Sequence, residues 1–369
     1  MRIRWKRGPL ALALALAALI LLGGGAAAEE EATLSETLPP ELTQAAPEAA
    51  ELLEEGGDMG LSSGAAALWE KSISEVKEYL LAGIRSVAML MCGVVVLGAV
   101  ESLTPDRRGT VGRGVTLCGA LWVTAVSAGD LETLMGLGRE TVTEISQFSK
   151  VLTPVMASAA ALSGGVTSAS VRQMGTVLFS DILLTAIDAL LLPAVYLYVG
   201  LAAAGTVLEG ETLDSAGRLL KKGIGWALGG LLLLFTTYLT VSGAVAGAVD
   251  ARAVKLAKSA IAGAVPVVGG ILSEAAESVL AGAGVLKAGA GVLGMLAVLA
   301  LCLTPFLRLG IQYLLYQGAA VVATAAGPGR LTRLISMLGD AFGLVLAMTG
   351  ASALLLLVSI LSSLTAVMP

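Results

Sequence analysis

The sequence predicts an all-α fold: a polytopic membrane bundle with two parallel internal repeats, each headed by a re-entrant-like broken hairpin. Three observations support this prediction. Hydrophobic residues make up 56% of the 369 residues and charged residues 14%, whereas soluble proteins carry about 25% charged residues. The mean hydropathy is +0.87. Six long apolar segments are separated by polar ones, and landmarks of residues 150–250 recur in residues 262–369.

The amino terminus predicts a signal peptide over residues 1–28. Four basic residues precede an apolar stretch, and Ala26, Ala27 and Ala28 form a small-residue cleavage site. The alternative is an uncleaved first span. Residues 29–60 follow with ten acidic residues and no basic one, which is typical of a disordered, acidic arm. In both cases this arm lies outside the cytoplasm.

Positive charge predicts how the spans are oriented. Basic clusters follow the first, third and fifth of the six apolar segments, as expected if these ends face the cytoplasm. The carboxyl terminus, Pro369, then lies outside the cytoplasm, as does the mature amino terminus. The predicted spans are residues 86–103, 114–129, 182–207, 225–249, 293–318 and 342–366.

Residues 61–149 combine the first two spans with two amphipathic stretches. One precedes the first span at residues 66–85, and the other follows the second span at residues 130–148. An apolar stripe at helical spacing predicts that each stretch is a helix lying at the membrane interface or against the bundle.

The repeat emerges when the sequence is shifted by 112 residues. Pro154 then falls on Pro266, Pro193 falls on Pro305, and the triplet Gly-Arg-Leu at 217–219 recurs at 329–331. Chance alignment of two helical hairpins in a biased composition is the alternative. Because each copy holds two spans, the copies are expected to be parallel, with kinks at Pro193 and Pro305.

Each copy begins with a segment that is apolar but broken by proline and glycine. The first, residues 150–170, contains Pro154 and the pair Gly164 and Gly165; the second is residues 259–280. Counting either segment as a span would place the following basic cluster outside the cytoplasm. We therefore expect a hairpin covered by other protein, because irregular backbone at membrane depth needs such cover.

Asp188 and Arg308 lie within predicted spans, in corresponding helices of the two repeats. A lone charge there is costly, about 2.5–3.5 kcal/mol on insertion scales. We expect an ion pair between them that ties the two repeats together. A polar pathway, to which Arg172 would contribute, is the alternative, and Arg308 could also extend to an interface.

The residue inventory predicts no enzyme, no cofactor and no metal site. The chain has no histidine and an odd count of three cysteines, all within apolar runs, which we interpret as buried fillers. No phosphate-binding loop of the G-x-x-x-x-G-K-[ST] type occurs. No basic stripe indicates nucleic-acid binding.

In the order of its parts, the chain resembles the stage III sporulation protein AE family. A signal peptide and an acidic arm precede "FSKVLTPVMASAAALSGGVTSAS", "GRLLKKGIGWALGGLLLLF" and "AIAGAVPVVGGILSEAAESVLAG". The resemblance implies an integral membrane protein in the mother-cell-derived membrane around the forespore. It also implies a channel or secretion-like complex with other membrane subunits, ring-forming subunits and a separate ATPase chain. The family has no defined catalytic residues to carry over.

Three functions remain open at this point. The first is a non-enzymatic channel or scaffold subunit of such a sporulation complex, supporting late forespore development. The second is a secondary transporter with a substrate site between the two repeats. The third is a purely structural assembly factor.

Overall fold

Every described stretch of the chain longer than one residue is helical. The computed structural model describes residue 44 and residues 61–103, 110–162, 166–208, 211–264, 269–326 and 329–364. The predicted signal peptide and nearly all of the predicted acidic arm lie outside these residues. The elements are α5 (Leu61–Leu103), α6 (Thr110–Leu162), α7 (Val166–Ala186), the π-helical turn η1 (Ile187–Leu191), α8 (Leu192–Leu208), α9 (Glu211–Ala264), α10 (Gly269–Ala326) and α11 (Gly329–Leu364).

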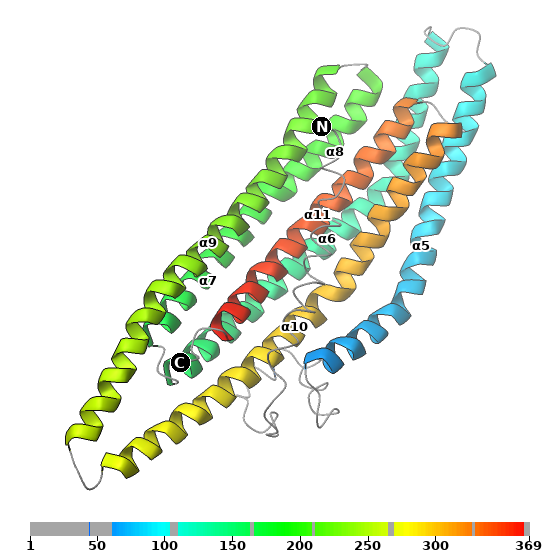
Figure 1. Ribbon diagram of the computed structural model, residues 1–369. Coiled ribbons are helices and arrows are strands. Elements are labelled where there is room, and N and C mark those ends of the chain that lie inside the picture. Colours follow the sequence, from blue (N-terminus) through cyan, green and yellow to red (C-terminus); the bar gives the residue numbers. More distant parts are fainter. Residues whose placement is uncertain are drawn as a thin grey trace.

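The helices form one elongated bundle in which successive helices run in opposite directions, with α7, η1 and α8 counting as one continuous rod (Figure 1). The connections after α5, α8 and α10 lie at one end of the bundle, and those after α6 and α9 lie toward the other. Within the bundle α11 packs against α6, α7, α8, α9 and α10, whereas α5 packs mainly against α6 and α10. The helix α11 is therefore the centre of the fold.

Six helical segments are long and apolar enough to cross a membrane, which confirms the predicted number of spans. They are longer than predicted. The helix α9 has 54 residues, or about 80 Å at 1.5 Å per residue, and a bilayer core is only about 30 Å thick. The segments are Val76–Leu103, Val111–Leu162, Ala169–Leu208, Ser215–Ser242, Gly289–Ala325 and Gly329–Leu364.

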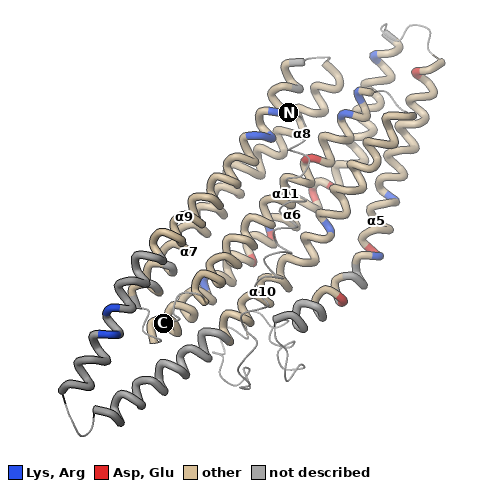
Figure 2. Tube along the Cα trace, in the orientation of Figure 1, with Lys and Arg blue, Asp and Glu red and all other residues tan. Residues whose placement is uncertain are grey.

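Basic residues lie at the end of the bundle where α5, α8 and α10 finish, and others lie along α5 and toward the opposite end of α9 (Figure 2). The sequence places the first group close to the three connections at this end, and all of those described are exposed apart from Lys221. Because this end carries the three basic clusters that were predicted to face one side, the direction of the helices agrees with the predicted alternation. The exposed residues are Arg113, Arg218, Lys222, Arg330 and Arg333.

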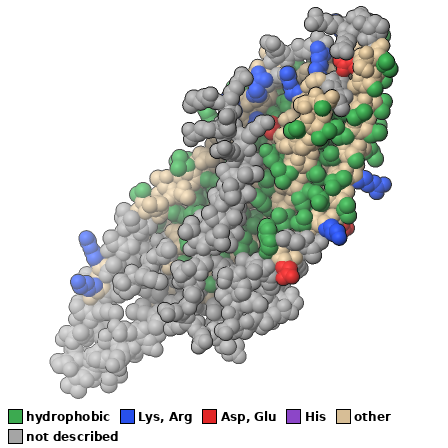
Figure 3. Space-filling model, turned by 45° about the vertical axis from the view of Figure 1, so that its right-hand side comes forward, with side chains coloured by type: hydrophobic (Ala, Val, Ile, Leu, Met, Phe, Trp, Pro, Cys, Tyr) green, Lys and Arg blue, Asp and Glu red, His purple; other side chains and the backbone are tan. Residues whose placement is uncertain are grey.

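Two clusters of buried apolar side chains hold the bundle together. The larger surrounds α11 and includes Leu338 and Phe342; the smaller joins the middle of α10 to α5, α6 and α11 through residues such as Leu293. Large apolar side chains also remain exposed on α5, α8 and α9, and Figure 3 shows one apolar outer face. Such faces suit contact with lipid.

The two predicted amphipathic stretches are confirmed as helices but are not separate elements. Residues 66–85 belong to α5, and residues 130–148 lie in the middle of α6. The stripe of the second stretch faces the protein, since Leu134, Val142 and Ile145 are each at most 4% exposed. Of the two positions left open for this stretch, packing against the bundle is the one observed.

The heads of the predicted repeats differ from the expectation of separate broken hairpins. Residues 150–162 continue α6 straight through Pro154, and α7 begins at Val166. Residues 259–264 end α9, and α10 begins at Gly269. Both heads are therefore the ends of long helices that meet at short connections. Pro266, Gly164 and Gly165 lie in these connections, outside the described residues.

Candidate functional site: two carboxylates inside the bundle

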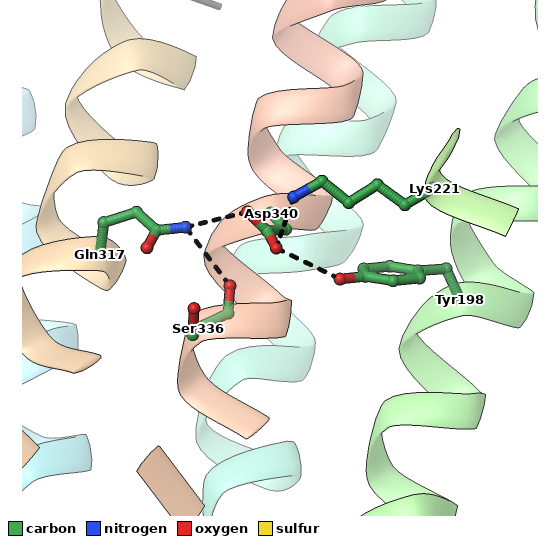
Figure 4. A network of polar contacts seen from close by, with 5 residues as sticks. All are labelled: Tyr198, Lys221, Gln317, Ser336 and Asp340. Atoms are coloured by element: carbon green, nitrogen blue, oxygen red, sulfur yellow. Dashed lines mark hydrogen bonds and ion pairs between the residues drawn. The ribbon is translucent and has the colours of Figure 1, made fainter. Parts of the chain in front are cut away.

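The carboxylate of Asp340 is the meeting point of four helices (Figure 4). Lys221 Nζ on α9 lies 2.6 Å from Asp340 Oδ2. From α10, the Gln317 amide donates to Asp340 Oδ1 at 3.1 Å, and it also reaches the Ser336 carbonyl at 3.4 Å. The Tyr198 hydroxyl on α8 donates to Asp340 Oδ2 over 3.5 Å, which is a weak bond at that length. We call these five residues the Asp340 hub.

Helix register explains why these residues meet. Tyr198 and Gln317 stand about ten residues before the ends of α8 and α10, and Lys221 and Asp340 stand about ten residues after the starts of α9 and α11. At 1.5 Å per residue all four lie about 15 Å from the same end of the bundle. The hairpins α8–α9 and α10–α11 thus each place two of these residues at the same distance from the end of the bundle.

Asp130 on α6 is the centre of a second polar cluster. Its Oδ2 accepts hydrogen bonds from Ser86 Oγ at 2.6 Å, from the Gln312 amide at 2.8 Å and from the Tyr316 hydroxyl at 2.9 Å. The Tyr316 hydroxyl is also within 3.1 Å of Ser127 Oγ. This cluster joins α5, α6 and α10 through neutral donors, whereas the Asp340 hub contains a lysine.

One segment of α10 serves both carboxylates. Gln312 and Tyr316, four residues apart, share the face toward Asp130, and Gln317 points to Asp340. Glycines allow this close approach: a Cβ at Gly83 would lie 2.8 Å from the Gln312 side-chain oxygen, and one at Gly339 would lie 3.2 Å from the Gln317 amide nitrogen. The two clusters are therefore fixed relative to each other by α10.

The predicted ion pair between Asp188 and Arg308 is wrong. Asp188 Oδ1 lies 2.9 Å from Arg139 Nε on α6, with both side chains partly exposed. The Arg308 guanidinium lies over the ring of Tyr79 on α5, 5.1 Å from its centroid, which is a cation–π contact. Asp188 and Arg308 contact different neighbours, because Asp188 lies on the side of its helix that meets α6 and Arg308 lies on the side of α10 that meets α5. A charged link between the two hairpins does exist, but it is Lys221–Asp340.

The predicted proline positions have different local structures. Pro154 is an exposed residue within α6, and Pro305 is a half-buried residue within α10. Pro193 is the second residue after the π-helical turn, whose wider ring is closed by a hydrogen bond from the Leu192 N–H to the Ile187 carbonyl. A proline has no N–H to bond the preceding turn, so an irregular turn at this point has a clear cause.

The remaining predictions concern chemistry. Arg172 belongs to α7, but its side chain lies outside the described part of the structure. Cys302 is buried as expected, whereas Cys92 and Cys118 are exposed, so the interpretation of all three as buried fillers is wrong for two of them. Among the described residues no group of three or more acidic, cysteine or histidine side chains could hold a metal ion.

Sequence comparison identifies relatives of this chain. A family model described as stage III sporulation protein AE matches residues 58–366. The stage III sporulation protein AE of Bacillus subtilis (strain 168) is 22% identical over 227 residues, which cover 62% of this chain and 57% of that protein. The chain thus aligns with somewhat more than half of its curated relative. No solved structure matches the chain significantly.

Proposed function

This chain belongs to the stage III sporulation protein AE family, and we propose that it is a non-enzymatic membrane subunit of a channel or secretion-like complex between mother cell and forespore. Its place would be the mother-cell-derived membrane around the forespore. Its partners would be other membrane subunits, ring-forming subunits and a separate ATPase chain. The six apolar helices are the coarse feature on which this proposal stands.

The observation that carries the proposal is the filled interior of the bundle. In the described part of the chain two cavities lie between the helices, with volumes of about 20 and 10 Å³. Pockets that hold small molecules are usually about 300–1,000 Å³. A passage for solutes or proteins would therefore be formed between chains, with this chain contributing a wall or a platform.

The two carboxylate clusters support a structural role in such an assembly. Asp340 and Asp130 connect helices that are distant in sequence, because the side chains that bind each carboxylate come from other helices. Fully bonded polar clusters of this kind specify one arrangement of a core. A rigid bundle with apolar outer faces suits a subunit that is held in lipid and surrounded by partners.

Orientation follows from the same proposal. The connections at residues 104–109, 209–210 and 327–328 would face the mother-cell cytoplasm, and both mature termini would lie on the opposite side, between the membranes. The two hairpins α8–α9 and α10–α11 would be the cores of two parallel repeats, which stay a prediction. Cysteine labelling tests the orientation: a cysteine replacing Arg113 should react only from the cytoplasm, and one replacing Lys150 only from outside.

The experiment that tests the function is capture of the tagged full chain from sporulating cells. We expect ring-forming membrane proteins and an ATPase to be recovered together with it. The tagged chain carrying Asp340→Asn should recover less of them per molecule if the packed bundle is the platform, and Asp188→Asn is the matched control on the outer surface. Recovery of the intact chain alone would contradict the proposal.

A secondary transporter with a site between the two repeats is the second candidate. The position of the Asp340 hub favours it, because this ion pair lies between the hairpins α8–α9 and α10–α11. The small cavities count against it. Uptake of a solute by vesicles that contain only the purified chain, abolished by Asp340→Asn, would support the transporter over the channel subunit.

A further inference from the structure

A row of small hydroxyl side chains lies along the contact between α6, α7 and α11. On each helix their spacing is three, four or seven residues, so they share one helix face. These faces meet inside the bundle, where six of the seven residues are at most 8% exposed. We define this hydroxyl seam as Ser146, Ser149 and Thr153 of α6, Thr176 and Ser180 of α7, and Ser352 and Ser359 of α11.

Two cavities among the described residues open onto this seam. The larger, about 20 Å³, is lined by Thr153, Thr176 and Ser359, by the side chains of Gln173 and Ser363, and by apolar residues including Met156. The smaller, about 10 Å³, is lined by Ser146, Ser149, Ser180 and Ser352 and by apolar residues. A cavity needs about 10–15 Å³ on this measure to hold one water molecule, which also needs two to four polar partners.

One hydroxyl in the seam lacks a partner. Ser146 Oγ is buried and has no hydrogen-bond partner among the described residues, although it lies at the wall of the smaller cavity. Leaving a buried hydroxyl unpaired is unfavourable. The neighbouring hydroxyls are satisfied differently: Thr153 donates to the Ser149 carbonyl at 2.6 Å, and Thr176 bonds Ser359 across the two helices.

We infer that the hydroxyl seam is a water-binding site built into the bundle, with one water bonded to Ser146 in the smaller cavity and one among Thr153, Thr176 and Ser359 in the larger. Size and polar lining agree with water in both cavities, and the smaller cavity also contains the unpaired hydroxyl of Ser146. Because of the hydroxyl seam, the two packed sides of α7 differ in chemistry. Toward α9 it packs with aromatic rings, Phe179 against Phe235 and Tyr238, and toward α11 with hydroxyls and water.

Hydroxyl-radical footprinting of the unmodified full chain in lipid discs tests this inference. Radiolysis of a bound water oxidises a neighbouring methionine to its sulfoxide, and Met156 lines the larger cavity. Met135, Met295 and Met348 are comparably buried, at 2%, 8% and 1% against 4% for Met156, but they line neither of the two cavities. We expect Met156 to be oxidised several-fold faster than all three. Equal rates would overturn the inference.

Two variants separate water from simple exposure. Thr176→Val keeps the shape but removes a polar partner, so oxidation of Met156 should fall toward the rate of Met295; unchanged oxidation would contradict a bound water. In the smaller cavity, Ser146→Ala should lower the melting temperature if a water is bonded to the hydroxyl. A raised melting temperature would show that the hydroxyl is unpaired and that this cavity is dry.

Discussion

The hairpins α8–α9 and α10–α11 are both apolar, but the protein uses their apolar surface in opposite ways. In the most apolar stretch of α11, 78% of the residues are buried, and in that of α10, 61%; the stretch of α9 is only 22% buried. Leu233 and Leu234 of α9 are largely exposed, whereas Leu334 and Leu338 of α11 are almost fully enclosed. Stretches that are all apolar enough to cross a membrane therefore have two environments, an exposed outer face for α9 and the interior of the protein for α11.

Both hairpins supply residues to the Asp340 hub, Tyr198 and Lys221 from α8–α9, but only the enclosed hairpin contributes to both carboxylate clusters. The enclosed hairpin supplies Asp340 and Gln317 to the hub and Gln312 and Tyr316 to the Asp130 cluster. A polar group among apolar side chains needs a partner that stays in place, and the central hairpin has neighbours on all sides to provide one. The outer ion pair of Asp188 has a more exposed setting.

Truncation of one leucine in each hairpin should give the largest difference in stability. Leu338→Ala, at a residue 1% exposed, should lower the free energy of unfolding by about 3 kcal/mol through the cavity it leaves. Leu234→Ala, at a residue 63% exposed, should cost less than about 0.5 kcal/mol. Thermal unfolding in detergent measures both. Equal losses would show that the burial of Leu338 in α11 does not contribute more to the free energy of unfolding than the exposed Leu234 of α9 does.

Removing the charge of Asp340 should have the next largest effect. Asp340→Asn leaves the Lys221 ammonium without its partner, and we expect a loss of about 2 kcal/mol. This is below the 3–5 kcal/mol typical of fully buried pairs, because the Lys221 and Asp340 side chains are 30% and 23% exposed.

A charge exchange tests the pair itself. Combining Lys221→Asp with Asp340→Lys should recover part of the stability that each reversal loses alone, as measured by a double-mutant cycle. If the double variant loses the sum of the two single effects, Lys221 and Asp340 contribute independently and the hub is not a unit.

The fold could be predicted well from sequence because its signals are long. Six apolar stretches and three basic clusters predicted six helices with three connections at one end, and both features are observed. The expected break at Pro154 is absent, because a single proline does not interrupt a helix as long as α6. Packing against neighbouring helices outweighs that local penalty.

The candidate site was missed for a different reason. Asp130 lies one residue beyond the predicted span 114–129, and Asp340 lies two residues before the predicted span 342–366. The predicted spans stop short of both residues, so neither of them was singled out from the sequence, although the helices extend well past them. The glutamines at 312 and 317 were a usable signal within a predicted span. The ion-pair partner of Asp188 could not be predicted, because no sequence pattern indicates which face of η1 this residue occupies.

Adding a methyl group beside α11 should have a moderate effect. A Cβ at Gly138 of α6 would collide with Val345 Cγ1 of α11, whereas Gly136, two residues away, has nothing within 4 Å. Gly138→Ala should cost about 1–2 kcal/mol net, since overpacking of roughly 1–3 kcal/mol exceeds the gain in helix propensity. Gly136→Ala should instead stabilise the protein by up to about 1 kcal/mol. Stabilisation by both changes would mean that α6 and α11 are not in close contact.

The smallest effect is expected at the outer ion pair. Asp188→Asn removes the charge facing Arg139, whose side chain is 62% exposed, and exposed pairs contribute about 0–1 kcal/mol. The loss in unfolding free energy should therefore be less than half of that caused by Asp340→Asn in the same assay, and the same change in an Arg139→Gln background should have no further effect. A loss as large as that of Asp340→Asn would mean that the Asp188 charge is enclosed in the assembled protein. A partner chain would then cover the contact between α6 and η1, and this outer surface would be a protein interface.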